Sequence, residues 1–339
     1  MAKRAVAKTV PVPKTSGNPD AVRKKFDIVR SADGALMAVA RDEPEARFRR
    51  AYGILDIHRP FKTRRYFQKR SNPAYRGPVI VAEGDSWFEF PLTKDILMWL
   101  GETYAVLSLA KAGDAWSDIQ DQNELLPAVR REKPNIVLLS VGGNEIMGNI
   151  DKYVHTYDAA LGRDDYLRPN FAPLLDWISG QYELTINQIL TIRPSAHVII
   201  HGYDYPNPRE WQQGGQWIGG PLENMLHIGD HTMWRHVANM MLDQFNERQR
   251  DLARRLGPRV HYLDLRKTIG RDDDEWLGPE DNWDDEIHGT SEAFGVIAAR
   301  FAAKIDEIAP AGAPLLAAVS AAGAKAKKTA SVKKKRRQA

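Results

Sequence analysis

Five short apolar runs recur along the middle of the chain, and each is followed by a segment with helical spacing. The runs are rich in valine, isoleucine and leucine and comprise residues 78–84, 104–110, 135–142, 197–203 and 260–265. The helix-like segments comprise residues 92–101, 117–132, 173–192, 232–256 and 290–308. In the last of these, Phe294, Ile297 and Phe301 recur every three or four residues, as one face of a helix requires. Apolar strands that alternate with helices predict a parallel sheet with helices on both faces.

This pattern predicts one doubly wound α/β domain over residues 76–310, with segments of different character around it. Residues 1–20 and 311–339 are rich in lysine and alanine and poor in aromatic residues, so we expect both ends to be disordered. Residues 21–75 are mixed and charged, and we expect an extension of short helices and an extended lead-in that packs on the domain.

A long insertion interrupts the alternation at residues 204–231. It is rich in glycine and proline, yet it carries several large apolar side chains. Loops of this length inside a compact domain are usually functional or disordered. We therefore expect a lid or a pocket wall, with an oligomer interface as the alternative.

The composition is that of a globular protein, with 43% hydrophobic residues and no cysteine. The absence of cysteine excludes disulfides, thiolate metal sites and cysteine nucleophiles, and it is compatible with the cytoplasmic location that we expect. No apolar run approaches the roughly 18 residues of a membrane-spanning helix. The N-terminal segment shows no apolar stretch typical of a secretory signal.

Positive charge is concentrated at the ends of the chain. Four of the 48 lysines and arginines lie in residues 1–19 and eight in residues 325–339, and neither segment contains an acidic residue. The intervening body therefore carries a net charge of −8, although the whole chain is at +4. A tail of this kind can bind nucleic acid or another polyanion through counterion release, and it can equally be a solubilising end.

Chemistry-bearing residues follow the predicted strands. Ser86 follows the first strand, Gly113 the second and Asn144 the third, while Asp285 and His288 precede the last helix. The carboxyl ends of parallel strands lie at one edge of a sheet, which is where open α/β sheets bind their ligands. We therefore expect these five residues to meet around one crevice.

This set of residues suits acyl transfer through a serine. A serine hydroxyl needs a base within hydrogen-bond reach, and histidine suits that role because its pKa lies near neutral pH. A carboxylate such as Asp285 fixes the tautomer of His288 and stabilises the imidazolium. The oxyanion of the tetrahedral intermediate needs hydrogen-bond donors. The candidates are the backbone N–H groups of Ser86 and Gly113 and the side-chain amide of Asn144.

Four blocks of the sequence, in this order, resemble the SGNH hydrolase (GDSL esterase/lipase) superfamily. They are "GDSW" (84–87), "AGD" (112–114), "GGNE" (142–145) and "DEIH" (285–288). The resemblance covers about residues 78–308 and implies a flavodoxin-like fold with a five-stranded parallel sheet. It also implies Ser86 as nucleophile, Asp285 and His288 as its triad partners, and Gly113 and Asn144 as oxyanion donors. Trp87 and Glu145 stand where the superfamily commonly has leucine and aspartate.

We therefore expect a serine esterase that hydrolyses carboxylic esters with no cofactor and no metal. The candidates for the substrate pocket are Asp85, Trp87, Tyr203, Trp211 and Trp217. The aromatic residues of the insertion and Trp87 suit an apolar acyl or aryl group. One alternative is a non-catalytic binding protein of the same fold that uses the basic C-terminal tail on a polyanion. A second alternative is a metal site among His227, His231 and His236, with Asp230 as a candidate third ligand, because His227 and His231 are four residues apart.

Overall fold

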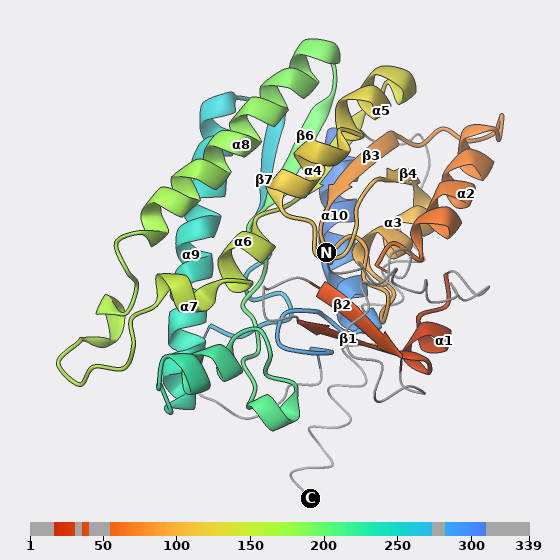
Figure 1. Ribbon diagram of the computed structural model, residues 1–339. Coiled ribbons are helices and arrows are strands. Elements are labelled where there is room, and N and C mark those ends of the chain that lie inside the picture. Colours follow the sequence, from red (N-terminus) through yellow and green to blue (C-terminus); the bar gives the residue numbers. More distant parts are fainter. Residues whose placement is uncertain (1–16, 31–35, 41–54, 273–281, 310–339) are drawn as a thin grey trace, which may run out of the picture.

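A parallel sheet of five strands forms the centre of the computed structural model, which describes residues 17–30, 36–40, 55–272 and 282–309 (Figure 1). The strands are β3 (Val79–Gly84), β4 (Ala105–Ser108), β5 (Ile136–Ser140), β6 (His197–His201) and β7 (Val260–Leu263). Their order in the sheet is β4-β3-β5-β6-β7, which is the flavodoxin-like order. The predicted fold class is therefore confirmed, and each predicted apolar run contains one strand.

Helices surround this sheet, and several of them cover its two faces. They are α3 (Ile96–Thr103), α4 (Trp116–Gln122), α5 (Leu125–Glu132), α6 (Gly143–Met147), α7 (Ile150–Tyr153), α8 (Phe171–Ile192), α9 (His231–Leu256) and α10 (Ser291–Ile308). Helices α5, α8 and α9 lie on one face, and α3 packs against α10 on the other (Figure 1). The predicted helix over 117–132 is two helices, because Asn123 adopts a left-handed conformation with φ of 49° and ends α4. No helix in the described part of the chain has the length and apolar character to span a bilayer.

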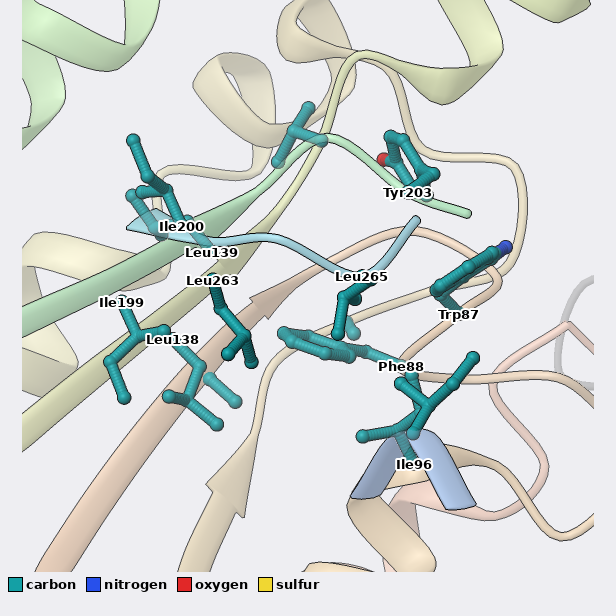
Figure 2. Packing of buried hydrophobic residues seen from close by; sticks show 14 of the residues in the cluster. Trp87, Phe88, Ile96, Leu138, Leu139, Ile199, Ile200, Tyr203, Leu263 and Leu265 are labelled. Atoms are coloured by element: carbon teal, nitrogen blue, oxygen red, sulfur yellow. The ribbon is translucent and has the colours of Figure 1, made fainter. Parts of the chain in front are cut away.

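The strands have continuous apolar sequences because both faces of the sheet are buried. Adjacent residues of a strand point to opposite faces, and Leu138 and Leu139 of β5 are both fully buried. The same holds for Ile199 and Ile200 of β6, and Figure 2 shows these side chains on the two sides of the sheet. This buried sheet gives the loops at its carboxyl edge a fixed base.

The segment before the sheet forms an antiparallel hairpin that the sequence analysis did not predict. The hairpin consists of β1 (Phe26–Arg30) and β2 (Leu36–Ala40). The same segment also contains the helices α1 (Pro19–Arg23) and α2 (Arg59–Arg70). The side chains of Val22 and Phe26 form a second, smaller core with Ile57, Phe90 and Leu92. Helix α2 packs along β4 and α3. The extension therefore supports the loop that follows β3.

The predicted disordered ends lie almost entirely outside the described residues. Of the N-terminal segment 1–20, only residues 17–20 are described, and Pro19 and Asp20 belong to α1 rather than to a disordered tail. The C-terminal segment 311–339, with the basic residues assigned to polyanion binding, lies outside the described residues altogether.

The insertion at 204–231 is packed into the body of the molecule. It contains the turns η2 (Trp211–Gln213) and η3 (Pro221–Met225), and its residues 204–208 and 217–222 are buried. A Cβ added to Gly215 or Gly219 would lie 1.9 Å from the carbonyl oxygen of Arg209, so only glycine permits this close approach.

Candidate active site

Ser86, His288 and Asp285 form one chain of hydrogen bonds. Ser86 lies two residues beyond the end of β3, and His288 lies in the loop before α10. The distance from His288 Nε2 to Ser86 Oγ is 2.7 Å, and His288 Nδ1 lies 2.7 Å from Asp285 Oδ2. The fold thus brings together residues about 200 positions apart, as the strand-end argument predicts.

Gly84 allows Ser86 to occupy this place. A Cβ at Gly84 would lie 2.5 Å from the carbonyl oxygen of Ser140, the last residue of β5. That carbonyl also accepts a hydrogen bond from the Asp85 N–H at 2.9 Å. The carboxyl ends of β3 and β5 can therefore approach each other only because residue 84 has no side chain.

The imidazole of His288 is buried between aromatic rings. The ring of Phe90 stacks on it with 3.8 Å between centroids, and Trp217 meets it edge-on at 6.1 Å. Since Phe90 belongs to the smaller core, the N-terminal extension contacts the candidate site through this ring.

Asp285 has the surroundings of an ionised carboxylate. Its Oδ1 accepts the N–H groups of Ile287 at 2.9 Å and His288 at 2.8 Å, and its Oδ2 faces the imidazole. Burial by itself would raise the pKa of Asp285, but the nearby His288 and these hydrogen bonds lower it overall. A charged Asp285 favours the tautomer with the proton on His288 Nδ1, which leaves Nε2 free to accept the proton of Ser86.

Of the three candidate oxyanion donors, Asn144 and Gly113 occupy different positions relative to the cavity. Asn144, at the start of α6, lines the cavity beside Ser86, and its Nδ2 donates to the carbonyl of Asp114 at 2.8 Å. That bond fixes the amide and uses one of its two N–H groups, so the second is the candidate donor. Gly113 is not among the described residues that line the cavity. Its φ of 86° requires glycine for the turn itself, whether or not its N–H binds an oxyanion.

A small cavity adjoins Ser86. Its volume is about 30 Å³, and its surface is predominantly apolar. The lining residues are Asp85, Ser86, Trp87, Gly143, Asn144, Met147, Tyr203, Asp204, Pro206, Leu242, Trp283 and Ile287. Asp85, Trp87 and Tyr203 were predicted to line it. Trp211 lies elsewhere because its ring packs on Gly220 at the surface, with 56% of the residue exposed, and Trp217 contacts His288 without lining the cavity.

Asp85 and Tyr203 form the polar part of the cavity wall. Asp85 accepts hydrogen bonds from the hydroxyl groups of Tyr203 and Ser140 and from the Trp87 N–H. Burial raises the pKa of Asp85 to about 6, although these hydrogen bonds oppose the rise. The partners of Asp85 come from the ends of β5 and β6, so this aspartate links the ends of the strands. The carboxylate that is bonded to His288 is that of Asp285.

Sequence reasoning missed Glu286, which stands between the two predicted residues of the last block. It is fully buried, and its carboxylate accepts four backbone N–H groups from the insertion. Glu286 follows directly on the acids Asp284 and Asp285, and no feature of the sequence indicates that its side chain binds the insertion. The signal in the sequence that the insertion packs against the site was its content of large apolar residues and glycines.

The histidines considered for a metal do not form a metal-binding group. Within residues 17–30, 36–40, 55–272 and 282–309, no three histidine, aspartate or glutamate side chains are arranged to hold an ion. His236 Nε2 lies 2.8 Å from Asp164 Oδ1, and the nearest carboxylate oxygen recorded for His231 is Glu210 Oε1 at 3.8 Å. These residues therefore carry surface contacts rather than a ligand set.

Comparison with known families decides the assignment. The model of the GDSL-like Lipase/Acylhydrolase family matches residues 85–294, which is more than half of the chain. The chain belongs to this family. The match begins at Asp85, inside the first of the four sequence blocks (84–87), and contains the other three blocks whole.

Solved structures resemble this GDSL-like protein at low sequence identity. An extracellular lipase from Streptomyces rimosus is 14% identical with a TM-score of 0.47, and covers 66% of this chain and 98% of its own. A phospholipase A1 from Streptomyces albidoflavus is 18% identical with a TM-score of 0.44, and covers 67% and 99%. A carbohydrate esterase family 3 protein from Talaromyces cellulolyticus is 17% identical with a TM-score of 0.41, and covers 68% and 97%. No curated protein matches the sequence.

Two positions distinguish this GDSL-like protein from the common pattern. Trp87 Nε1 donates to the carbonyl of Ile287 at 3.0 Å, so its ring links the loop of the serine to the loop of the histidine. Glu145 Oε1 accepts the N–H of Trp116 at 2.7 Å, at the first turn of α4. Burial raises the pKa of Glu145 to about 7. A leucine at position 87 would have no side-chain donor for the first of these bonds, and an aspartate at position 145 would be one methylene shorter.

Proposed function

We propose that the protein is a serine esterase that hydrolyses carboxylic esters through an acyl-enzyme. The observation that carries this proposal is the continuous chain Asp285–His288–Ser86, with 2.7 Å at each link. These distances lie in the range over which a base can take a proton from a nucleophile. Membership of the GDSL-like Lipase/Acylhydrolase family supports the same chemistry.

In the proposed reaction, Ser86 Oγ attacks the ester carbonyl while His288 Nε2 takes its proton. The carbonyl oxygen becomes an oxyanion beside Asn144 and the N–H of Ser86, with Gly113 as the third candidate donor. Collapse of the intermediate breaks the bond to the alcohol, which leaves with the proton from His288. A water molecule, deprotonated by His288, then attacks the acyl-enzyme, and the acid is released with Ser86 restored.

The cavity favours an ester with a short acyl group. About 30 Å³ accommodates one or two water-sized groups, and the walls are mostly apolar. Trp87, Leu242 and Trp283 supply large apolar surface to the space beside Ser86. We therefore propose acetyl and similarly short acyl esters as the substrate class.

Hydrolysis of p-nitrophenyl acetate, butyrate and octanoate by the wild type, Ser86→Ala and Ser117→Ala, all with a chelator, tests this function. Ser117 is an exposed serine on α4 and controls for loss of a hydroxyl. We expect turnover of acetate by the wild type and by Ser117→Ala, and none above background by Ser86→Ala. Equal turnover by the Ser86 variant, or no turnover of any ester, would overturn the proposal and favour the binding protein.

A further inference from the structure

Glu286 makes an unusual set of contacts for a buried acid. Its Oε1 accepts the N–H groups of Arg209 and Gly219, each at 2.8 Å. Its Oε2 accepts those of Trp217 at 2.6 Å and Ile218 at 2.8 Å. The backbone carbonyl of Glu286 accepts a fifth N–H, from Asn207, at 2.8 Å. One residue of the loop that carries His288 (residues 283–289) thus binds five backbone groups of the insertion.

The insertion binds the histidine loop in return. The guanidinium of Arg209 donates to the carbonyl oxygens of Trp283 and Asp284, each at 2.9 Å. We call residues 207–219 together with 283–286 the clasp. The half that belongs to the insertion is tightly packed, since Gly215 and Gly219 lie against the Arg209 carbonyl. The clasp therefore joins the wall of the cavity to the loop that carries Asp285 and His288.

A buried carboxylate is a costly way to hold two loops together. Burial raises the pKa of Glu286 to about 7, although the four N–H groups oppose the rise. Removing a charge from water costs several kcal/mol, and well-packed apolar residues of similar volume are often as stable or more so. Stability alone therefore gives little reason for a glutamate here. Directional bonds, by contrast, fix a loop in one position in a way that apolar contacts do not.

We propose that Glu286 is a positioning residue, which holds the loop of Asp285 and His288 at hydrogen-bond distance from Ser86 by binding the insertion. This inference rests on the proposed esterase function. Glu286 does not contact the reacting atoms and acts through its neighbours on either side. Since Trp283 belongs to the clasp and lines the cavity, the same contacts also set one wall of the acyl site.

Glu286→Gln is the variant that tests this role, with Glu223→Gln as its matched control. Glutamine keeps the size of the side chain, but its terminal NH₂ faces two N–H donors and cannot accept from them. Glu223 lies in the same insertion, in η3, outside the clasp. For both variants and the wild type, the measurements are kcat and KM for p-nitrophenyl acetate, per active site titrated with a fluorophosphonate. The titration counts only active sites that are folded, so a loss of folded protein does not lower kcat per active site.

For Glu286→Gln we expect kcat per active site to fall about 10- to 100-fold with KM little changed, because misplacement of a catalytic group by about 1 Å costs on the order of 10²-fold. Glu223→Gln should match the wild type. Glu286→Asp keeps the charge and should recover part of the loss of kcat. If Glu286→Gln does not fold, Glu286→Asp takes its place in the comparison with Glu223→Gln. Wild-type kcat per active site in both Glu286 variants would overturn the inference and leave the esterase intact. Absence of wild-type turnover would instead overturn the proposed function.

Discussion

The serine loop, residues 85–95, and the histidine loop, residues 283–289, are held by different means. In the serine loop, Glu89 and Asp95 both bind the ammonium group of Lys62, at 2.5 and 2.6 Å. In the histidine loop, Glu286 binds only backbone N–H groups among its recorded hydrogen-bond donors. The buried acids of the serine loop are thus held by a buried cation, and the buried acid Glu286 of the histidine loop by oriented peptide groups.

This difference shows where each loop depends on the rest of the chain. Lys62 lies on α2, in the N-terminal extension, whereas the partners of Glu286 lie in the insertion. Burial alone would lower the pKa of Lys62, but the two carboxylates raise it overall, so the lysine is charged at neutral pH. Neither the extension nor the insertion contains one of the four motif blocks. The motifs supply the chemistry, and these two segments hold it in place.

The largest effect is expected from Asp285→Asn, which changes the carboxylate bonded to His288 and leaves the hydrogen bonds of Glu286 and Arg209 in place. An amide at residue 285 favours the wrong tautomer of His288, so kcat should fall by about 10³- to 10⁴-fold, as for loss of the aspartate in other triads. Asp284→Asn is the control, since Asp284 pairs with Arg23 instead. Steady-state hydrolysis of p-nitrophenyl acetate measures both. A loss below tenfold in Asp285→Asn would show that this carboxylate does not orient His288.

Lys62→Met tests the serine loop in the same way. It leaves Glu89 and Asp95 buried without their cation, so the free energy of unfolding should fall by about 3 to 5 kcal/mol. Urea denaturation followed by tryptophan fluorescence measures the change. Lys25→Met, at an exposed position, should change the free energy of unfolding by less than about 0.5 kcal/mol. Equal stability of the two variants would show that the ion pairs do not hold this loop.

The acid that precedes the serine loop gives a pH-dependent prediction. Glu83 is buried at the end of β3, where Oε1 accepts the Gly84 N–H and Oε2 has no hydrogen-bond partner among the described residues. Burial raises the pKa of Glu83 from 4.5 to about 8. The folded state therefore holds this proton more tightly than the unfolded state. Its contribution to stability is complete below pH 4.5 and is lost as the pH rises to about 8.

Glu83→Gln should remove this loss. Glutamine keeps an acceptor for Gly84 and cannot ionise, so at pH 8 the variant should be more stable than the wild type by about 2 to 4 kcal/mol. Near pH 4.5 the two proteins should be nearly equal. Urea denaturation at pH 4.5, 6 and 8 gives the three differences. A difference that does not grow with pH would show that Glu83 ionises normally in the folded protein.

The smallest effect is expected from Trp87→Phe, which removes a direct link between the two loops. The variant leaves the carbonyl of Ile287 without the N–H of Trp87, at a cost of about 0.5 to 1.5 kcal/mol of stability. Because Phe90 still stacks on His288, kcat should change by less than about tenfold. Thermal unfolding and the acetate assay measure the two quantities. A larger loss of kcat than in Glu286→Gln would make Trp87, rather than Glu286, the main support of the histidine loop.

Much of the fold could be predicted because the strands of a doubly wound sheet are continuous apolar runs. The grouping of Ser86, Asn144, Asp285 and His288 followed from the common edge of parallel strands. The hairpin of β1 and β2 was not predicted, because the sequence alone does not show that Phe26 and Ala38 form a second core with Phe90 and Leu92. Lys62 and Glu286 could not be predicted either, because a buried charge is recognised by its tertiary partners and not by its own sequence position.

The most direct test of the account is to label the protein with a fluorophosphonate and locate the adduct by mass spectrometry. The account predicts a single adduct on Ser86, absent in Ser86→Ala and formed more slowly in Asp285→Asn and Glu286→Gln than in their matched controls. An adduct on another residue, or ester hydrolysis that continues with Ser86 unlabelled, would contradict it.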